Sequence, residues 1–160
     1  MDIEIQEQQT AEYSQRWFDF KDGAKILIAS ANKPAFKRSL ELNNLQSEQE
    51  MAGFKPITDE SASKAQFAFH RSAAHLILGW SGLNVKGKPF EYTHQNAELL
   101  CTSSSTTHEL VLFVLEKAKT LETERETAIE DEVGKSSSTT SKETSGGRLK
   151  KPKPSTKSSE

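Results

Sequence analysis

The side chains best suited to catalysis or metal binding are one cysteine and four histidines: Cys101, His70, His75, His94 and His108. His70 and His75 are five residues apart, which is about 140° around a helix, so they would not share a face. The sequence holds no His-Glu-x-x-His motif, and its single cysteine has no second thiolate at metal-ligand spacing. It therefore predicts no metal site and no internal disulfide.

Two residues could in principle act as nucleophiles. Ser81 lies in a Gly-Trp-Ser-Gly sequence that partly resembles a nucleophile elbow, but the second glycine comes one place early and no strand is expected before it. Cys101 lies seven residues from each of two histidines, and only a spatial neighbour could activate it. No phosphate-binding Gly-x-x-x-x-Gly-Lys-Ser/Thr run occurs. We therefore expect no catalytic residue, no cofactor and no enzyme activity.

The elements that would position these residues are one hairpin and four helices. Asp22-Gly23 between two apolar runs predicts a β-hairpin over about 17–28, because glycine accepts a positive φ at little cost. Apolar spacing and capping residues predict helices over about 33–52, 58–78, 93–100 and 107–131. The apolar run 110–115 could instead be a strand, although the threonines before it and the charged residues after it favour a helix.

The second helix is expected to carry an apolar stripe of mostly small residues at three- and four-residue steps. The stripe consists of Ala62, Ala65, Phe69, Ala73 and Leu76. Small side chains would let a partner helix approach closely. Gly79 is expected to end this helix, and residues 79–82 to form a turn.

Composition divides the chain in two. Its 160 residues carry a net charge of −2, but residues 134–160 hold seven basic and two acidic side chains, hence +5, which leaves −7 for residues 1–133. The segment 134–160 is rich in Ser, Thr and Lys and lacks aromatic residues, so it cannot offset a chain entropy of roughly 1–2 kcal/mol per residue. We expect one compact domain over 1–133 and a disordered basic tail over 134–160. The tail could be a solvated linker, or an arm for nucleic acid or an acidic partner.

The fold class expected is therefore α+β, mainly α, with an N-terminal β-hairpin, a small helical domain and a disordered C-terminal tail. No apolar run approaches the roughly 18 residues of a membrane span, and the acidic start is unlike a secretory signal. Near-neutral overall charge makes general nucleic-acid binding an unfavoured function.

Large apolar residues are the remaining candidates for function. Core packing is their usual role, whereas exposed Trp and Tyr dominate the energetics of protein interfaces. We take Trp17 and Trp80 as the first anchors to test. The full set of candidate partner-binding residues is Trp17, Phe20, Phe69, Leu76, Trp80, Leu110 and Val114. The same stripes could also support a homo-oligomer.

Two stretches of the chain together resemble a known family. The first is Trp-Phe-Asp-Phe-Lys-Asp-Gly-Ala-Lys at 17–25, followed by Asn-Lys-Pro-Ala-Phe at 32–36. The second is Leu-Gly-Trp-Ser-Gly-Leu at 78–83, then a Gly-Lys loop, Pro-Phe at 89–90 and Asn-Ala-Glu-Leu-Leu at 96–100. With the helical segment 108–121, this order resembles the tail assembly chaperones of long-tailed, siphovirus-type bacteriophages. The Ser/Thr-rich stretch 101–107 and the basic tail depart from that pattern.

The resemblance implies a small, mainly helical protein of the infected host's cytoplasm. Such proteins bind the phage tape-measure protein, keep it soluble, help recruit tail-tube subunits, and are absent from the mature virion. Many also exist in a longer form made by ribosomal frameshifting. The alternatives are a structural phage protein, such as a head–tail connector or minor tail component, and a nucleic-acid-associated regulator using the basic tail.

Overall fold

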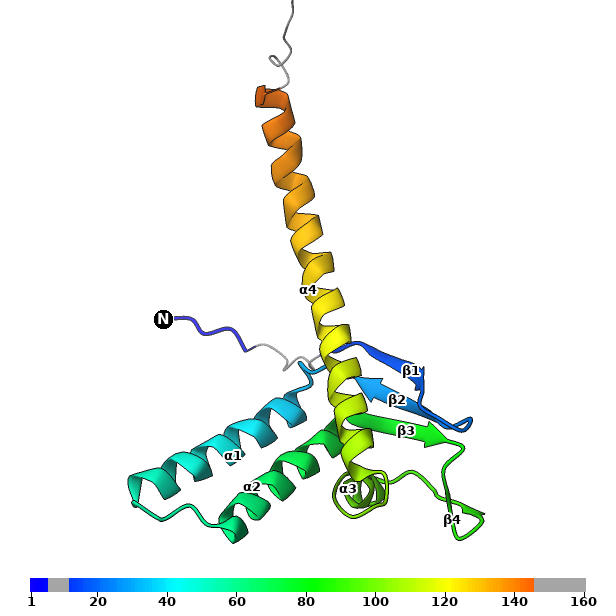
Figure 1. Ribbon diagram of the computed structural model, residues 1–160. Helices are drawn as coiled ribbons and strands as arrows, with labels where there is room; N and C mark the ends of the chain where they lie inside the picture. The colour runs from blue at the N-terminus through cyan, green and yellow to red at the C-terminus, as the bar shows by residue number, and fades with distance from the viewer. Residues whose placement is uncertain (6–11, 146–160) are drawn as a thin grey trace, which may run out of the picture. The chain divides into compact units, whose positions relative to one another are not determined.

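The computed structural model describes residues 1–5 and 12–145, with side chains described as far as residue 133 (Figure 1). The chain forms two compact units, the first spanning Met1–Glu122 and the second beginning at Thr123. The first unit combines a three-stranded sheet with helices, and the fold is mainly helical with an N-terminal β-hairpin, as expected.

The predicted hairpin is confirmed. Strand β1 (Gln15–Asp19) pairs antiparallel with β2 (Lys25–Ala29). The connection turns at Asp22 and Gly23, whose φ angles are 52° and 80°. Two successive residues at positive φ match the right-handed twist of the flanking strands, which explains the Asp-Gly pair.

A third strand replaces the end of the second predicted helix. Helix α2 (Asp59–Ser72) stops six residues earlier than expected, and the short 3-10 helix η1 (Ala73–Leu76) leads into β3 (Ile77–Ser81). The interpretations of Gly79 as a helix stop and of 79–82 as a turn are therefore wrong. The apolar residues of this segment pair antiparallel with β2 instead, and that long-range pairing overrides local helical periodicity.

Gly79 in β3 lies next to the indole of Trp17. A Cβ at this position would lie 3.7 Å from Cη2 of Trp17 and 3.9 Å from Cβ of Leu27. The indole of Trp17 therefore lies across the outer face of the sheet, over the backbone of β3. The register also shifts at this point: Leu27 faces Gly79 and Ile28 faces Ile77, which leaves Leu78 as the extra residue of a bulge.

The helices begin where their sequence signals place them. Helix α1 (Pro34–Ala52) starts with proline in its first turn, and α3 (His94–Thr102) is capped by the hydroxyl of Thr93. The threonine hydroxyl at residue 58 caps α2 in the same way, as one half of a reciprocal capping box. A short hairpin of β4 (Asn84–Val85) and β5 (Lys88–Pro89) precedes α3.

Helix α4 (Thr107–Ser145) settles the ambiguity of the run 110–115 in favour of helix. It continues past residue 133, where the sequence analysis places the start of a disordered tail. Residues 146–160 of that expected tail lie outside the described residues.

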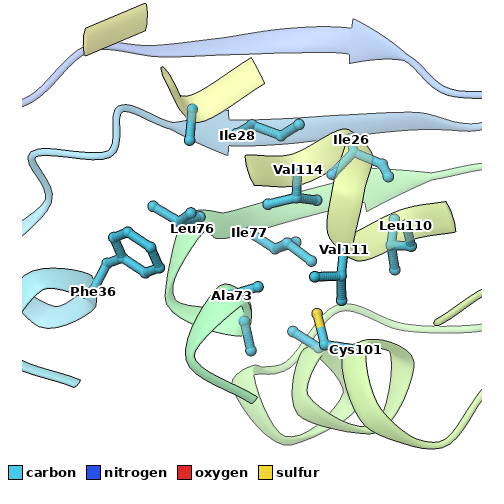
Figure 2. Close-up of a cluster of buried hydrophobic side chains, with 13 residues drawn as sticks. Ile26, Ile28, Phe36, Ala73, Leu76, Ile77, Cys101, Leu110, Val111 and Val114 are labelled. Atoms are coloured by element: carbon cyan, nitrogen blue, oxygen red, sulfur yellow. The ribbon is translucent and has the colours of Figure 1, made fainter. Parts of the chain in front are cut away.

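The core lies between the inner face of the sheet and the helices (Figure 2). Ile26 and Ile28 point inward from the central strand and meet η1, α3 and the first turns of α4. The fully buried aliphatic side chains include Leu76, Leu110 and Val114, which are at most 2% exposed. Phe36 is the buried residue of α1, at the end of that helix nearest the core.

Candidate protein-binding surface on the α1–α2 hairpin

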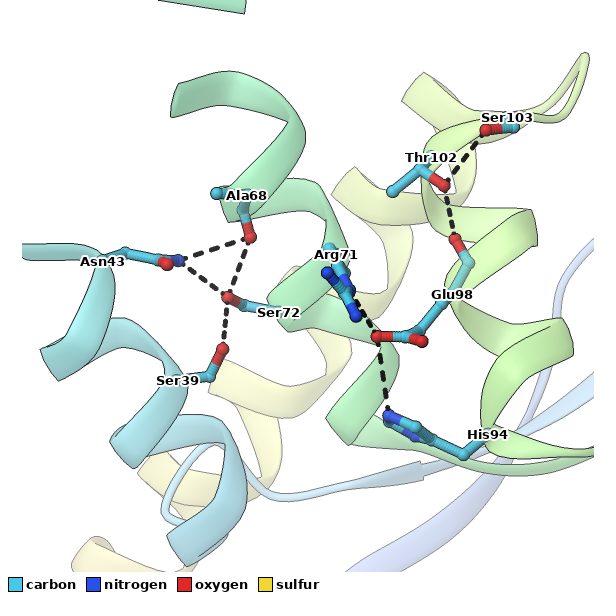
Figure 3. Close-up of polar contacts among 9 residues, drawn as sticks. All are labelled: Ser39, Asn43, Ala68, Arg71, Ser72, His94, Glu98, Thr102 and Ser103. Atoms are coloured by element: carbon cyan, nitrogen blue, oxygen red, sulfur yellow. Dashed lines mark hydrogen bonds and ion pairs between the residues drawn. The ribbon is translucent and has the colours of Figure 1, made fainter. Parts of the chain in front are cut away.

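Helices α1 and α2 form a helical hairpin whose seam is polar (Figure 3). The hydroxyls of Ser39 and Ser72 lie 2.7 Å apart. Asn43 donates from Nδ2 to Ser72 Oγ at 2.9 Å and to the Ala68 carbonyl at 3.3 Å. Such a seam fixes the register of the two helices, because each partner satisfies a polar group that would otherwise be buried unpaired. The large apolar side chains of the hairpin take no part in these hydrogen bonds.

Those apolar side chains are exposed. Leu42 and Leu45 of α1 and Phe67 of α2 are each about half exposed. At the far end of the hairpin, Phe54 and Ile57 are each 92% exposed. Together with Met51, which is 76% exposed, Phe54 and Ile57 define what we call the tip surface. Clusters of exposed large apolar residues are uncommon on soluble proteins and mark interaction sites.

The backbone at the tip is held in an unusual conformation. Helix α1 ends in a Schellman motif: the Phe54 N–H donates to the Met51 carbonyl, and the Lys55 N–H donates to that of Glu50. The left-handed position of this motif usually holds glycine, but here it holds Phe54, with φ of 55°. Gly53, one place earlier, has an ordinary φ of −81°. An aromatic side chain is therefore presented to solvent at a conformational cost, with no packing in the described fold to compensate.

Charges around the tip surface are predominantly acidic. Glu48, Glu50 and Asp59 are close to the tip residues in sequence, with Lys55 as a cation among them. The neighbouring Glu60 is already paired with Lys64 at 3.1 Å. An apolar tip with an acidic rim is complementary to a partner whose apolar face is flanked by Lys or Arg.

Three of the seven candidate binding residues lie inside the core. Leu76, Leu110 and Val114 are in the buried cluster that joins η1, α4 and the sheet. This agrees with the core role that apolar periodicity favours. Their side chains hold the scaffold together and present no surface.

Two more of the seven are partly buried by aromatic neighbours. Phe20 lies 5.0 Å, centroid to centroid, from Phe113 of α4. Trp80 stacks on Phe90, meets Tyr92 edge-on, and donates from Nε1 to the Phe90 carbonyl at 2.6 Å. These contacts anchor the segment between β5 and α3 against the outer edge of β3.

Trp17 and Phe69 remain as surface residues, 51% and 42% exposed. They do not lie on the same element: Trp17 covers the outer face of the sheet, and Phe69 lies on α2. Sequence reasoning missed the tip surface itself. The available signal was a large aromatic residue between the two helix-ending residues Gly53 and Pro56, where a buried role is not expected.

The two candidate nucleophiles lie on different elements, Cys101 on α3 and Ser81 in β3. Cys101 is fully buried, and burial raises its thiol pKa to about 12, so the thiolate is scarce at neutral pH. Ser81 is exposed at the end of β3. Within residues 1–5 and 12–145, no group of three or more His, Cys, Asp or Glu is arranged to hold a metal ion. None of the described helices is both long and apolar enough to cross a membrane.

Glu98 organises the polar surface between α2 and α3 (Figure 3). Its Oε2 accepts from Arg71 Nε at 2.6 Å and lies 3.8 Å from His94 Nε2. These contacts link the C-terminal end of α2 to α3, and both are made by the carboxylate of Glu98.

Comparison with known proteins matches part of the chain to a protein family. No curated protein and no solved structure matches the chain. A family described as YdaY prophage protein matches residues 31–135, about two thirds of the chain. The match covers the helical hairpin, β3, α3 and α4 as far as residue 135, and it begins after the β1–β2 hairpin. The chain therefore belongs to the YdaY prophage protein family and is a phage-related protein.

Proposed function

We propose that this prophage protein is a tail assembly chaperone. In this proposal it binds an apolar helical segment of the tape-measure protein, keeps it soluble, and helps recruit tail-tube subunits. It acts in the host cytoplasm, performs no catalysis and leaves before the virion is complete. The observation that carries the proposal is Phe54, an aromatic side chain 92% exposed on a backbone of positive φ.

The tip surface has enough apolar area for reversible binding. Burying Met51, Phe54 and Ile57 against a client would contribute roughly 1.5–3 kcal/mol for each side chain. Association costs of at least about 4 kcal/mol offset much of this gain, so these three side chains alone would give a dissociation constant of about 0.1 mM or weaker. Such binding suits a helper that must release its client.

The client chemistry follows from the tip. A tape-measure helix that is insoluble alone exposes an apolar stripe, and a helix laid on an apolar surface is a common mode of peptide recognition. The acidic rim of Glu48, Glu50 and Asp59 favours a stripe flanked by basic residues.

Co-expression tests the proposal directly. A tape-measure fragment is produced with the full chain, and its soluble fraction is measured. The double variant Phe54→Ser with Ile57→Ser is expected to lose most of the rescue. Leu112→Ser is the matched control, because Leu112 is 56% exposed on α4, away from the tip. No rescue by an excess of wild-type protein would contradict the proposal, and equal loss in the control would contradict the assignment to the tip.

Mass spectrometry of purified particles separates the chaperone from a structural phage protein. The chain is expected to be present during tail assembly and absent from mature particles. Recovery in fixed copy number from infectious virions would favour the connector or minor tail component instead.

A further inference from the structure

The side-chain ammonium of Lys33 lies where the start of α1, η1 and the residues before β1 meet. It directly precedes α1, and its Nζ donates to the His75 carbonyl in η1 at 2.7 Å. The same Nζ lies 5.9 Å from the ring centroid of Tyr13, which precedes β1. The His75 carbonyl is near the end of a helical segment, where a cation is favourable. This contact uses one of the three N–H donors of the ammonium and leaves two.

No carboxylate among the residues that the structure describes forms an ion pair with Lys33. The carboxylate of Glu98 accepts a hydrogen bond from Arg71 and lies 3.8 Å from His94 Nε2. The ring centroids of His75 and His94 lie 4.8 Å apart. Among the described residues, the half-buried ammonium of Lys33 therefore has no carboxylate partner, its charge acts on His75, and partial burial lowers the pKa of Lys33.

We propose that Lys33, His75 and His94 form a binding site for a carboxylate, supplied by an acidic side chain of a protein partner. The carboxylate accepts hydrogen bonds from the free N–H donors of Lys33 and from an imidazole of the pair. A polyanion such as nucleic acid fits less well, because residues 1–133 carry a net charge of −7. The site is separate from the tip surface and does not depend on the proposed function, because a small carboxylate can test it.

Proton uptake should accompany binding. The pKa of His75 is lowered by burial first, and then by the charges of His94, Lys33 and Arg71, while Glu98 acts in the opposite direction. A bound carboxylate would act as Glu98 does and raise the pKa of His75. Binding should therefore strengthen as the pH falls through the titration of His75.

The test follows the four imidazoles of the full chain by NMR during pH titration. Sodium acetate replaces sodium chloride at constant ionic strength. Acetate is expected to raise the pKa of His75 and to leave the imidazole chemical shifts of the exposed His108 unchanged at each pH. Lys33→Met is expected to weaken the acetate effect about fivefold, whereas Lys33→Arg keeps it. Lys37→Met, at an exposed position of α1, removes an equal charge as the control.

Three results would overturn the proposal. The first is an acetate effect on His75 no larger than that on His108. The second is an equal loss in Lys33→Met and Lys37→Met. The third is a response of His75 to inorganic phosphate with none to acetate, which would point to a phosphate ligand. Because Lys33→Arg keeps the charge and the donors, its response distinguishes loss of the site from loss of the fold.

Discussion

Phe54, and not its neighbour Gly53, occupies the left-handed position that closes α1. The two residues stand in the reverse of the usual order, since glycine is the residue that adopts a positive φ without strain. The conformational cost falls on a side chain that makes no contact in the core.

Phe54→Gly is therefore expected to stabilise the folded protein while impairing its function. Removing a non-glycine residue from positive φ should raise the free energy of unfolding by about 1 kcal/mol, measured by urea denaturation. Solubilisation of the tape-measure fragment should fall in the same variant. A fall in stability would show that Phe54 contributes packing. Full solubilising activity would remove Phe54 from the binding surface.

Gly82→Ala is expected to be more damaging than the same change at Gly87. Both glycines have positive φ, 78° and 76°, so both changes introduce similar backbone strain. Only at Gly82 would the new Cβ meet backbone, 3.0 Å from the Gly23 carbonyl oxygen and 3.1 Å from Ala24 Cα. Thermal unfolding should show a loss of about 1 kcal/mol for Gly87→Ala and about 2–3 kcal/mol for Gly82→Ala. Equal losses would mean that the loop at Gly82 moves freely.

Leu110 and Leu112 provide a matched pair on one helix. Leu110 is 2% exposed in the core, and Leu112 is 56% exposed. Leu110→Ala should cost about 2–5 kcal/mol of unfolding free energy, because it removes buried apolar area and leaves a cavity. Leu112→Ala should stay within about 0.5 kcal/mol of wild type. Similar costs in chemical denaturation would contradict the way α4 is oriented on the sheet.

The thiol of Cys101 should be unreactive toward alkylating reagents at neutral pH until the protein unfolds. Its pKa is raised by burial to about 12, so folding favours the protonated thiol. The contribution of this pKa shift to the free energy of unfolding is fully present below the unfolded pKa of about 9. It is lost as the pH rises toward 12, by about 1.4 kcal/mol per pH unit. Cys101→Ala should show a shallower decline of stability above that pH. Rapid alkylation of the native protein would contradict the burial.

Local signals in the sequence were sufficient for most of the elements. Asp22-Gly23 predicts the hairpin, and Thr58 and Thr93 predict the starts of two helices, because turn and cap preferences depend on neighbouring residues alone. The strand β3 could not be found in this way. Residues 77–81 continue a helical apolar pattern, and only their pairing with β2, about fifty residues away, makes them a strand.

The candidate surface was less accessible to sequence reasoning than the fold. Leu76, Leu110 and Val114 were candidate partner-binding residues but are buried in the core, because apolar spacing alone does not separate them from Trp17, which is half exposed. The tip surface depends on the polar seam formed by Ser39, Asn43 and Ser72. Until that pairing is known, nothing indicates that the large apolar residues of the hairpin lack an internal partner.

The place of the helical hairpin in the chain has an evolutionary consequence. It leaves the sheet at the end of β2 and returns at β3, the adjacent antiparallel strand, so its two ends are anchored close together. Lengthening such an excursion adds little closure entropy, because that cost grows only with the logarithm of loop length. Related prophage proteins could therefore differ in the length and side-chain chemistry of this helical hairpin, while the sheet and its covering helices remain as they are.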